Sequence, residues 1–133
     1  MKLSRKSEYA CLAIIDLAEQ RGQGYVATAE IARRKHIPRK YLEQILLSLR
    51  RAGQVKSIRG AEGGYQLARP PEEISVADVV RLMDGALAPV ESVSKYFYAH
   101  TPIEGQPKLL AVFRDIRDYV ADKLEKTTFA DII

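Results

Sequence analysis

The side chains with the clearest potential chemistry lie on one face of a predicted helix that begins beside Pro38 and runs to Gly53. Apolar residues at positions i, i+3, i+4 and i+7 predict the buried face of this helix: Leu42, Ile45, Leu46 and Leu49. The opposite face carries Arg39, Lys40, Glu43, Gln44 and Leu47, followed by Arg50 and Arg51 in the last turn. Cationic and amide side chains of this kind hydrogen-bond to phosphates and to base edges in a DNA major groove, and an exposed leucine can contact a thymine methyl group.

The residues before Pro38 predict a second, shorter helix that would hold this face in position. Thr28 precedes Ala29-Glu30-Ile31-Ala32 and is expected to be the N-cap of a helix that ends with Arg33, Arg34 and Lys35. Pro38 cannot continue that helix, but proline is favoured at the start of the next one. Two helices joined by a tight turn form a helix-turn-helix motif, in which the second helix lies in the major groove.

After Gly53 the hydrophobic period changes from 3.6 to 2, which predicts a β-hairpin. The apolar residues of its two arms are Val55 and Ile58, then Tyr65 and Leu67. The turn between the arms reads Gly60-Ala61-Glu62-Gly63-Gly64, and its glycines permit positive φ angles. Lys56 and Arg59 lie on the first arm, so the hairpin is interpreted as a wing that enters a narrow minor groove with its arginine leading. A plain surface turn is the alternative.

Charge is distributed unevenly along the 133 residues, a length that suits one compact domain. Residues 1–69 hold 14 Lys and Arg against 6 Asp and Glu, a net charge of +8, whereas residues 70–133 hold 7 against 11, a net charge of −4. We expect a winged helix-turn-helix DNA-binding unit in 1–69, and a linker, short helix, loop and dimerisation helix in 70–133. A basic half suits a polyanion such as nucleic acid, although a solvated basic surface would have the same charge.

The segment Leu3 to Arg21 is predicted to be a helix that is apolar over most of its circumference. Cys11 lies within this apolar surface, so a small core residue is favoured over a redox sensor. One cysteine cannot form an internal disulfide, and alone it cannot supply the thiolates of a zinc or iron–sulfur site. The last helix of the chain is expected to cover part of this N-terminal helix.

The acidic half is predicted to hold a short helix capped by Ser75 and closed by Gly85, followed by an irregular segment from Ala86 to Pro107. A long helix with an apolar stripe then precedes Thr127-Thr128 and an apolar tail of Phe129, Ile132 and Ile133. Six residues of the stripe are expected to form a homodimer interface: Leu109, Val112, Phe113, Ile116, Tyr119 and Val120. Dimeric helix-turn-helix proteins place two reading heads about 34 Å apart. A monomer whose last helix folds back is the alternative.

The fold class is therefore expected to be mainly α with one small β-hairpin: a winged helix-turn-helix plus a long C-terminal dimerisation helix. An enzyme is not expected, because the chain has no Ser/His/Asp order, no Cys/His pair and no phosphate-binding glycine loop beside a strand. No apolar run approaches the ~20 residues that span a bilayer, and no signal peptide is evident, so a cytoplasmic protein is expected. No catalytic residue, metal ligand or cofactor is predicted.

Three blocks of sequence point to a known family. They are Met1-Lys2-Leu3-Ser4-Arg5-Lys6-Ser7-Glu8-Tyr9-Ala10, Tyr41-Leu42-Glu43-Gln44 and Val55-Lys56-Ser57-Ile58-Arg59-Gly60-Ala61-Glu62-Gly63-Gly64-Tyr65. Together they closely resemble the bacterial Rrf2 family, and the resemblance covers essentially the whole chain. It implies a homodimeric winged-helix transcription factor whose recognition helix enters the major groove of operator DNA and whose hairpin reaches the minor groove.

The resemblance also implies roles for single residues. By position, Lys40, Glu43 and Gln44 would read bases and Tyr41 would contact the DNA backbone. The hairpin would contribute Ser57, Arg59 and Gly60. The complete set of expected DNA-binding residues is Thr28, Arg39, Lys40, Tyr41, Glu43, Gln44, Arg50, Ser57, Arg59 and Gly60.

The loop before the long helix departs from the family pattern. Cluster-binding members carry three cysteines there, whereas this chain reads Val90-Glu91-Ser92-Val93-Ser94-Lys95-Tyr96-Phe97-Tyr98-Ala99-His100. Ser92 stands where the first cysteine is usually found. Serine is a poor iron ligand, and His100 alone cannot hold a cluster. The cluster-free, CymR-like members are therefore the closer analogy, and in them the signal arrives through a regulatory protein or a small-molecule effector.

The expected function is that of a DNA-binding transcriptional regulator that acts as a repressor. A second hypothesis is an adaptor that binds other proteins through a winged-helix scaffold. It would use the acidic half of the chain and the aromatic group Tyr96-Phe97-Tyr98, since aromatic side chains often mark interfaces.

Overall fold

The computed structural model describes residues 2–133, and Met1 lies outside the described residues. Within them the chain forms α-helices and one two-stranded antiparallel sheet, which confirms the predicted mainly α fold with a small hairpin. The helices and strands are α1 (Arg5–Glu19), α2 (Thr28–Lys35), α3 (Arg39–Arg51), β1 (Val55–Ile58), β2 (Gly64–Leu67), α4 (Val76–Asp84) and α5 (Pro107–Lys126). Short 3₁₀ turns are η1 (Pro71–Glu73), η2 (Glu91–Val93), η3 (Pro102–Gly105) and η4 (Phe129–Ile132). No described helix is both long enough and apolar enough to cross a membrane.

Local chemistry sets the ends of the first helices, with one correction to the sequence analysis. The Ser4 hydroxyl accepts a hydrogen bond from the Ser7 N–H at 3.0 Å and so caps α1. Thr28 is the first residue of α2 and Ala27 is its N-cap, so the prediction of Thr28 as N-cap is wrong by one residue. The helix starts there because a β-bridge to the hairpin holds the chain just before it in an extended conformation. His36 ends α2 in the left-handed conformation, with φ 54°.

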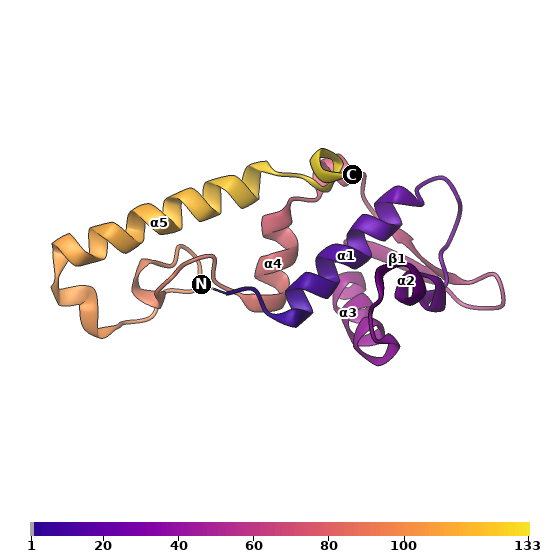
Figure 1. Ribbon diagram of the computed structural model, residues 1–133, viewed down its shortest axis with the longest axis horizontal. Coiled ribbons are helices and arrows are strands. Elements are labelled where there is room, and N and C mark those ends of the chain that lie inside the picture. The colour runs from indigo at the N-terminus through magenta and orange to yellow at the C-terminus, as the bar shows by residue number, and fades with distance from the viewer. Residues whose placement is uncertain (1) are drawn as a thin grey trace.

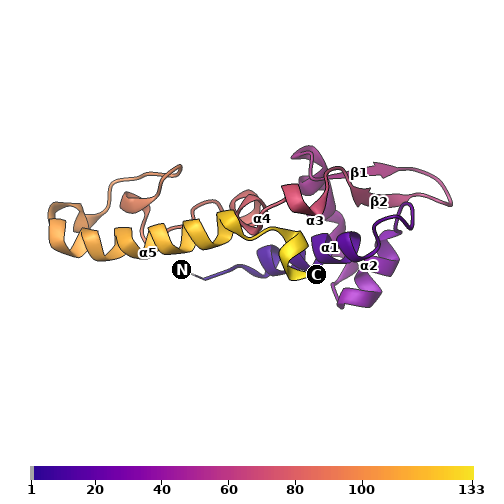
Figure 2. The same ribbon diagram turned by 90° about the horizontal axis from the view of Figure 1, so that it is seen from above.

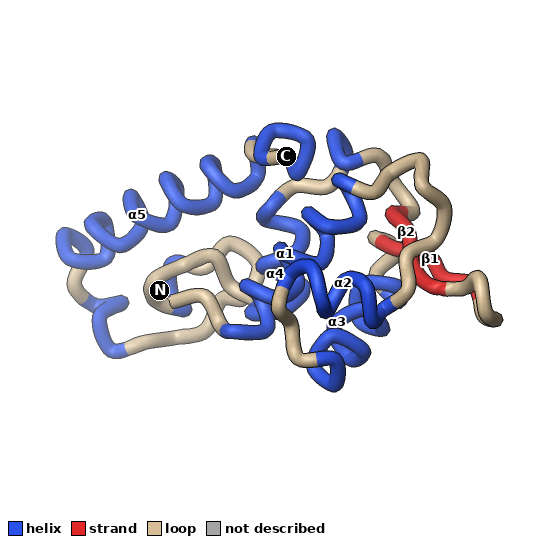
Figure 3. The backbone as a smooth tube through the Cα atoms, turned by 45° about the vertical axis from the view of Figure 1, so that its right-hand side comes forward, coloured by secondary structure: helices blue, strands red, loops and turns tan. Residues whose placement is uncertain are grey.

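The core of the winged-helix unit, which consists of α1, α2, α3 and the β1–β2 hairpin, forms around α1. The buried side of α1 packs against α3, and α1 also packs against α2, α4 and η4. The buried residues of α3 are the four predicted from the periodicity: Leu42, Ile45, Leu46 and Leu49. The two strands lie at the edge of this helical body, and the turn between them projects away from it (Figure 3). The register pairs Val55 with Leu67 and Ser57 with Tyr65.

The long helix α5 does not cover α1, contrary to the expectation. It packs against α4, where Val120 and Leu124 contact a buried cluster that includes Ala77 and Val80. α4 lies between α1 and α5 (Figure 1). This arrangement follows from the two apolar sides of α4, because Val79 belongs to the core around α1 while Ala77 and Val80 face α5.

The C-terminal half forms an arm beside the winged-helix unit. Ser75 caps the start of α4 and Gly85 follows its last residue, as predicted, and the structure adds a capping box between Ser75 and Asp78. The segment predicted to be irregular from Ala86 to Pro107 is a loop with two 3₁₀ turns over residues 86–106, and Pro107 is already the first residue of α5. α5 and this loop run side by side and extend away from the hairpin (Figures 1 and 2).

The end of the chain returns to the winged-helix unit. Thr128 forms a β-bridge with Ser75, and the Phe129 N–H donates to the Ile74 carbonyl oxygen at 3.0 Å. The Phe129 side chain is completely buried in the core around α1. The predicted apolar tail is therefore part of the core at Phe129, whereas Ile132 and Ile133 are exposed.

Candidate nucleic-acid interface

α3 presents most of the predicted polar face to solvent. Arg39, Lys40, Glu43 and Gln44 are exposed, whereas Leu47 is half-buried, which differs from the expected exposed position. Arg39 Nε lies 3.6 Å from Glu43 Oε1, so these two side chains form a pair across one turn. The exposed face of α3 therefore presents the Lys40 ammonium group, the Gln44 amide and the weakly paired Arg39 and Glu43 side chains to a ligand.

A groove of about 440 Å³, here called the α3–wing groove, lies between α3 and the hairpin. Six of the ten predicted DNA-binding residues line it: Thr28, Arg39, Arg50, Ser57, Arg59 and Gly60. Arg50 Nη1 donates to Ser57 Oγ at 3.3 Å and joins the end of α3 to β1. Within the described residues no side chain caps the start of α2, whose first residues also line the groove. Uncapped N–H groups at a helix N-terminus favour an anion such as phosphate.

Three further predicted residues gather on the other flank of α3. Lys40, Tyr41 and Gln44 line a hollow of about 520 Å³ together with Pro38. Tyr41 is 56% exposed, and its ring centroid lies 6.1 Å from that of Tyr9 on α1. Helical geometry places Glu43, the tenth predicted residue, between this hollow and the α3–wing groove. The ten residues thus lie on one continuous surface, and their contacts with DNA stay a prediction.

Backbone pairing with the segment before α2 fixes the hairpin and so shapes the α3–wing groove. The Val26 N–H donates to the Tyr65 carbonyl oxygen at 2.7 Å, and the Tyr65 N–H donates to the Val26 carbonyl oxygen at 2.8 Å. Gly64 has φ +151°, and a Cβ atom at this position would lie 2.2 Å from the Val26 carbonyl oxygen. Only glycine permits this approach of the two backbone segments.

Comparison with known proteins decides the family of this chain. A family model described as Rrf2, an iron-dependent transcriptional regulator, matches residues 3–133. The chain belongs to the Rrf2 family. It is 36% identical over 132 residues to the HTH-type transcriptional regulator CymR of Bacillus subtilis (strain 168), which covers 99% of this chain and 89% of the relative.

Solved structures of family members have the same fold as this Rrf2 protein. The structure of CymR, the global cysteine regulator of B. subtilis, superposes with a TM-score of 0.86 at 35% identity, over 99% of this chain and 95% of that one. IscR of T. potens superposes with a TM-score of 0.78 at 34% identity, over 99% of this chain and 85% of that one. The chain is therefore a helix-turn-helix transcriptional regulator with a winged-helix fold, and this class of protein binds DNA.

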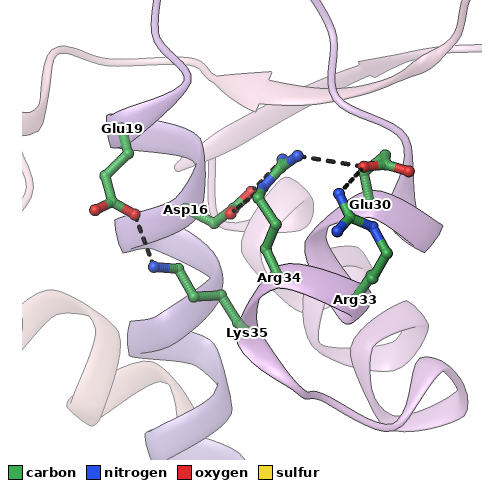
Figure 4. A network of polar contacts seen from close by, with 6 residues as sticks. All are labelled: Asp16, Glu19, Glu30, Arg33, Arg34 and Lys35. Atoms are coloured by element: carbon green, nitrogen blue, oxygen red, sulfur yellow. Dashed lines mark hydrogen bonds and ion pairs between the residues drawn. The ribbon is translucent and has the colours of Figure 1, made fainter.

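In this Rrf2 regulator, α2 is fixed to α1 by an ion pair that the sequence analysis missed. Arg34 Nε and Nη2 donate to the two carboxylate oxygens of Asp16 at 2.8 and 2.9 Å, and the Asp16 side chain has no exposed surface (Figure 4). The pKa of Arg34 is raised above its usual value, mainly by its hydrogen bonding to Asp16. The other pairs of the network are Arg33–Glu30 at 2.7 Å, Arg34–Glu30 at 3.4 Å and Lys35–Glu19 at 2.7 Å. The sequence signal for this ion pair is Asp16 itself, a carboxylate inside the apolar stripe of α1.

The description of the family names iron, so the side chains of this chain that could bind a metal are compared with the ligands that an iron–sulfur cluster needs. Cys11, the sole cysteine, is half-buried on α1. Burial, and to a lesser degree the charge of Asp84, raises the pKa of its thiol to about 11. A thiol that stays protonated at neutral pH is a poor nucleophile and a poor ligand. Cys11 packs against both buried apolar clusters, consistent with its interpretation as a core residue.

The loop that carries cysteines in cluster-binding relatives is closed by other polar contacts here. The hydroxyl oxygens of Ser92 and Thr101 lie 2.6 Å apart in a hydrogen bond, and Glu104 contacts both Tyr98 and His100. Across residues 2–133, no three His, Cys, Asp or Glu side chains gather in a way that could hold a metal ion. These donors do not fit a cysteine-ligated cluster.

The six predicted interface residues of α5 lie on two sides of the helix. Leu109, Val112, Ile116 and Tyr119 are between 44% and 73% exposed and follow one another at intervals of 3, 4 and 3 residues. Val120 instead packs against the α4 cluster, and Phe113 is half-buried. Within the described residues, the unpartnered apolar face of α5 thus consists of Leu109, Val112, Ile116 and Tyr119.

Proposed function

We propose that this Rrf2 protein is a homodimeric, sequence-specific DNA-binding regulator that represses transcription in the bacterial cytoplasm. The observation that carries the proposal is the α3–wing groove, where the start of α2, two arginines of α3 and the tip of the wing converge. Such a groove suits a DNA phosphate, because backbone N–H groups and Arg side chains are the usual donors to phosphate oxygens. A phosphate held there would place α3 in the major groove and the hairpin over the adjacent minor groove.

Base reading is assigned to the exposed middle of α3. Gln44 can form a bidentate pair with adenine, and Lys40 can donate to the O6 and N7 atoms of guanine. Glu43 can accept from the cytosine amino group once its pairing with Arg39 gives way to a phosphate contact of that arginine. Arg59, at the end of the first hairpin arm, is assigned to the narrow minor groove.

Dimerisation is assigned to the unpartnered apolar face of α5. The 3-4-3 spacing of its four residues is that of a coiled-coil seam, in which apolar residues recur every 3.5 residues on average. A two-fold axis through paired α5 helices would present two copies of α3 to one face of a DNA duplex.

Regulation without an iron–sulfur cluster is proposed, since the donors of Cys11 and of the 86–106 loop do not suit one. A regulatory protein or a small-molecule effector would then carry the signal. An anaerobic preparation of the protein should be colourless and free of iron, whereas a brown protein with visible iron–sulfur absorbance would contradict this part of the proposal.

The function is tested by genome-wide footprinting of the native protein in its host. Discrete protected sites with two-fold symmetry are expected, and deletion of the gene should raise transcription of the adjacent genes. Affinity for such a site should fall with salt, with a log–log slope of about −0.9 for each phosphate contacted. Capture of a partner protein without any DNA affinity would instead favour the adaptor hypothesis.

A further inference from the structure

A second concave site lies at the base of the wing. This wing-root cavity has a volume of about 260 Å³ and is enclosed between the end of α1, the loop that follows it and the hairpin. Figure 1 shows that loop running beside the two strands. Lys56 and Gln66, which pair across the two strands, line the cavity, whereas their neighbours Ser57 and Tyr65 line the α3–wing groove. Because successive residues of a strand point to opposite faces, the two sites lie on opposite faces of the hairpin.

Three cations from separate segments converge on the wing-root cavity. Arg21 follows α1, Lys56 lies in β1 and Arg69 follows β2, and no carboxylate is among the residues that line the cavity. Among residues 2–133, the ion pair of Arg21 is a long contact of 3.7 Å to Glu72, in which both side chains are more than half exposed. Within the part of the chain that the structure describes, the side-chain partner of Arg69 is the amide oxygen of Gln54, at a hydrogen-bond distance of 3.5 Å. The positive charge in this cavity is thus poorly compensated by the protein itself.

The other polar groups of the cavity are suited to the same kind of ligand. Gln20 and Gln66 line it, and their amide groups can donate hydrogen bonds to an oxyanion. Arginine binds carboxylates and phosphates through two parallel hydrogen bonds, and lysine adds a point charge. At about 30 Å³ for each water, the cavity has room for roughly nine waters, which is less than a drug-sized ligand needs.

We propose that the wing-root cavity binds a small oxyanion with two or three negative charges, carried by phosphate or carboxylate groups. The bound ion would bridge Arg21 on the α1 side to Lys56 and Arg69 on the hairpin side. It would lie away from the α3–wing groove, so this site is independent of the proposed DNA contacts.

The proposal is tested by recording amide NMR spectra of the full chain during titration with citrate and, separately, with inorganic phosphate. Sodium chloride keeps the ionic strength constant. Saturable shifts are expected at the amides of Gly24, Gln66 and Ala68, and the anion with the lower Kd identifies carboxylate or phosphate as the preferred group. Arg69→Gln and Arg21→Gln should each weaken that binding at least tenfold. Arg5→Gln, which removes the same charge from the exposed start of α1, should change it less than twofold.

Three results would overturn the proposal. The shifts could grow linearly without saturation, or Arg5→Gln could weaken binding as much as Arg69→Gln does. The third is that neither anion saturates while Arg69→Gln lowers affinity for operator DNA as strongly as Arg59→Ala, which would assign these cations to the DNA interface. A failure of the homodimer or operator proposal would leave the anion titration unaffected, so the two accounts can be judged separately.

Discussion

Asp16 holds the orientation of α2 relative to α1, because both of its oxygens accept hydrogen bonds from Arg34 and its side chain is fully buried. Asp16→Ala should lower the free energy of unfolding by about 3 kcal/mol, since it removes both short hydrogen bonds of the half-buried Arg34 guanidinium and leaves that cation only its 3.4 Å contact with Glu30. Glu19→Gln is the matched control. It removes the Glu19–Lys35 pair, which is more exposed and should contribute less than about 1 kcal/mol. Urea denaturation measures both losses, and two equally small losses would contradict this role of Asp16.

Gln44 and Arg59 should affect DNA binding in different ways. Gln44→Ala should relax the preference for one base pair by about 1–3 kcal/mol, because it removes a base contact in the major groove. Arg59→Ala should weaken binding mainly at sites whose flanking minor groove is rich in A·T pairs, where the groove is narrow and its potential most negative. Fluorescence anisotropy with a panel of single-base operator variants separates the two effects. A uniform loss across all sequences from both substitutions would refute the assigned roles.

At the scale of single elements, the position of the wing depends on Gly64. Gly64→Ala should push β2 away from Val26 and weaken operator binding by roughly tenfold, about 1.4 kcal/mol, because the α3–wing groove would lose its shape. Gly105→Ala is a suitable control, since a Cβ atom there meets nothing within 4 Å. Its affinity for DNA should stay within twofold of that of the native chain. If the Gly64→Ala protein bound the operator with native affinity, the close contact between β2 and Val26 would not be needed to position the wing.

Elements with strong local signals could be predicted from the sequence. The buried face of α3, the Ser75 cap and the glycine-rich turn follow from spacing and from the conformations that single residues favour. The exact start of α2 at Thr28 could not be predicted, because it depends on the pairing of Val26 with Tyr65, which lies far along the chain. The packing of Val120 against the α4 cluster could not be predicted either, because periodicity alone does not show which side of α5 faces α4.

At the scale of the whole molecule, contacts between distant segments were beyond the reach of sequence patterns. Sequence spacing does not show that Phe129 fills the core around α1, and a carboxylate in the apolar stripe of α1 does not by itself identify Arg34 as the partner of Asp16. Those contacts join the arm to the winged-helix unit and fix α2 on α1. The exposed positions of Arg39, Lys40, Glu43 and Gln44 on α3 could be predicted from helical spacing, whereas the separation of the surface into the α3–wing groove and a second hollow required the three-dimensional structure.

The exposed apolar face of α5 should control assembly. Ile116→Glu should weaken self-association by roughly tenfold or more, because a buried unpaired carboxylate is costly in an apolar interface. Ala111→Glu adds the same charge at an exposed position of α5 outside that face and should leave association unchanged. Sedimentation equilibrium measures both proteins. Monomeric native protein at working concentrations, or equal effects of the two substitutions, would contradict the proposed interface.

Hydroxyl-radical footprinting on a genomic binding site is the most direct test of the proposal that a homodimer binds DNA with two copies of α3, because it reports where each copy contacts the duplex. Paired chains should protect two tracts whose centres lie about 34 Å apart, one helical turn, with further protection in the neighbouring minor grooves. Arg59→Ala should remove the minor-groove protection and leave the two central tracts in place. A single protected tract, or no protection at any site, would contradict the account of a dimer that reads DNA with two copies of α3.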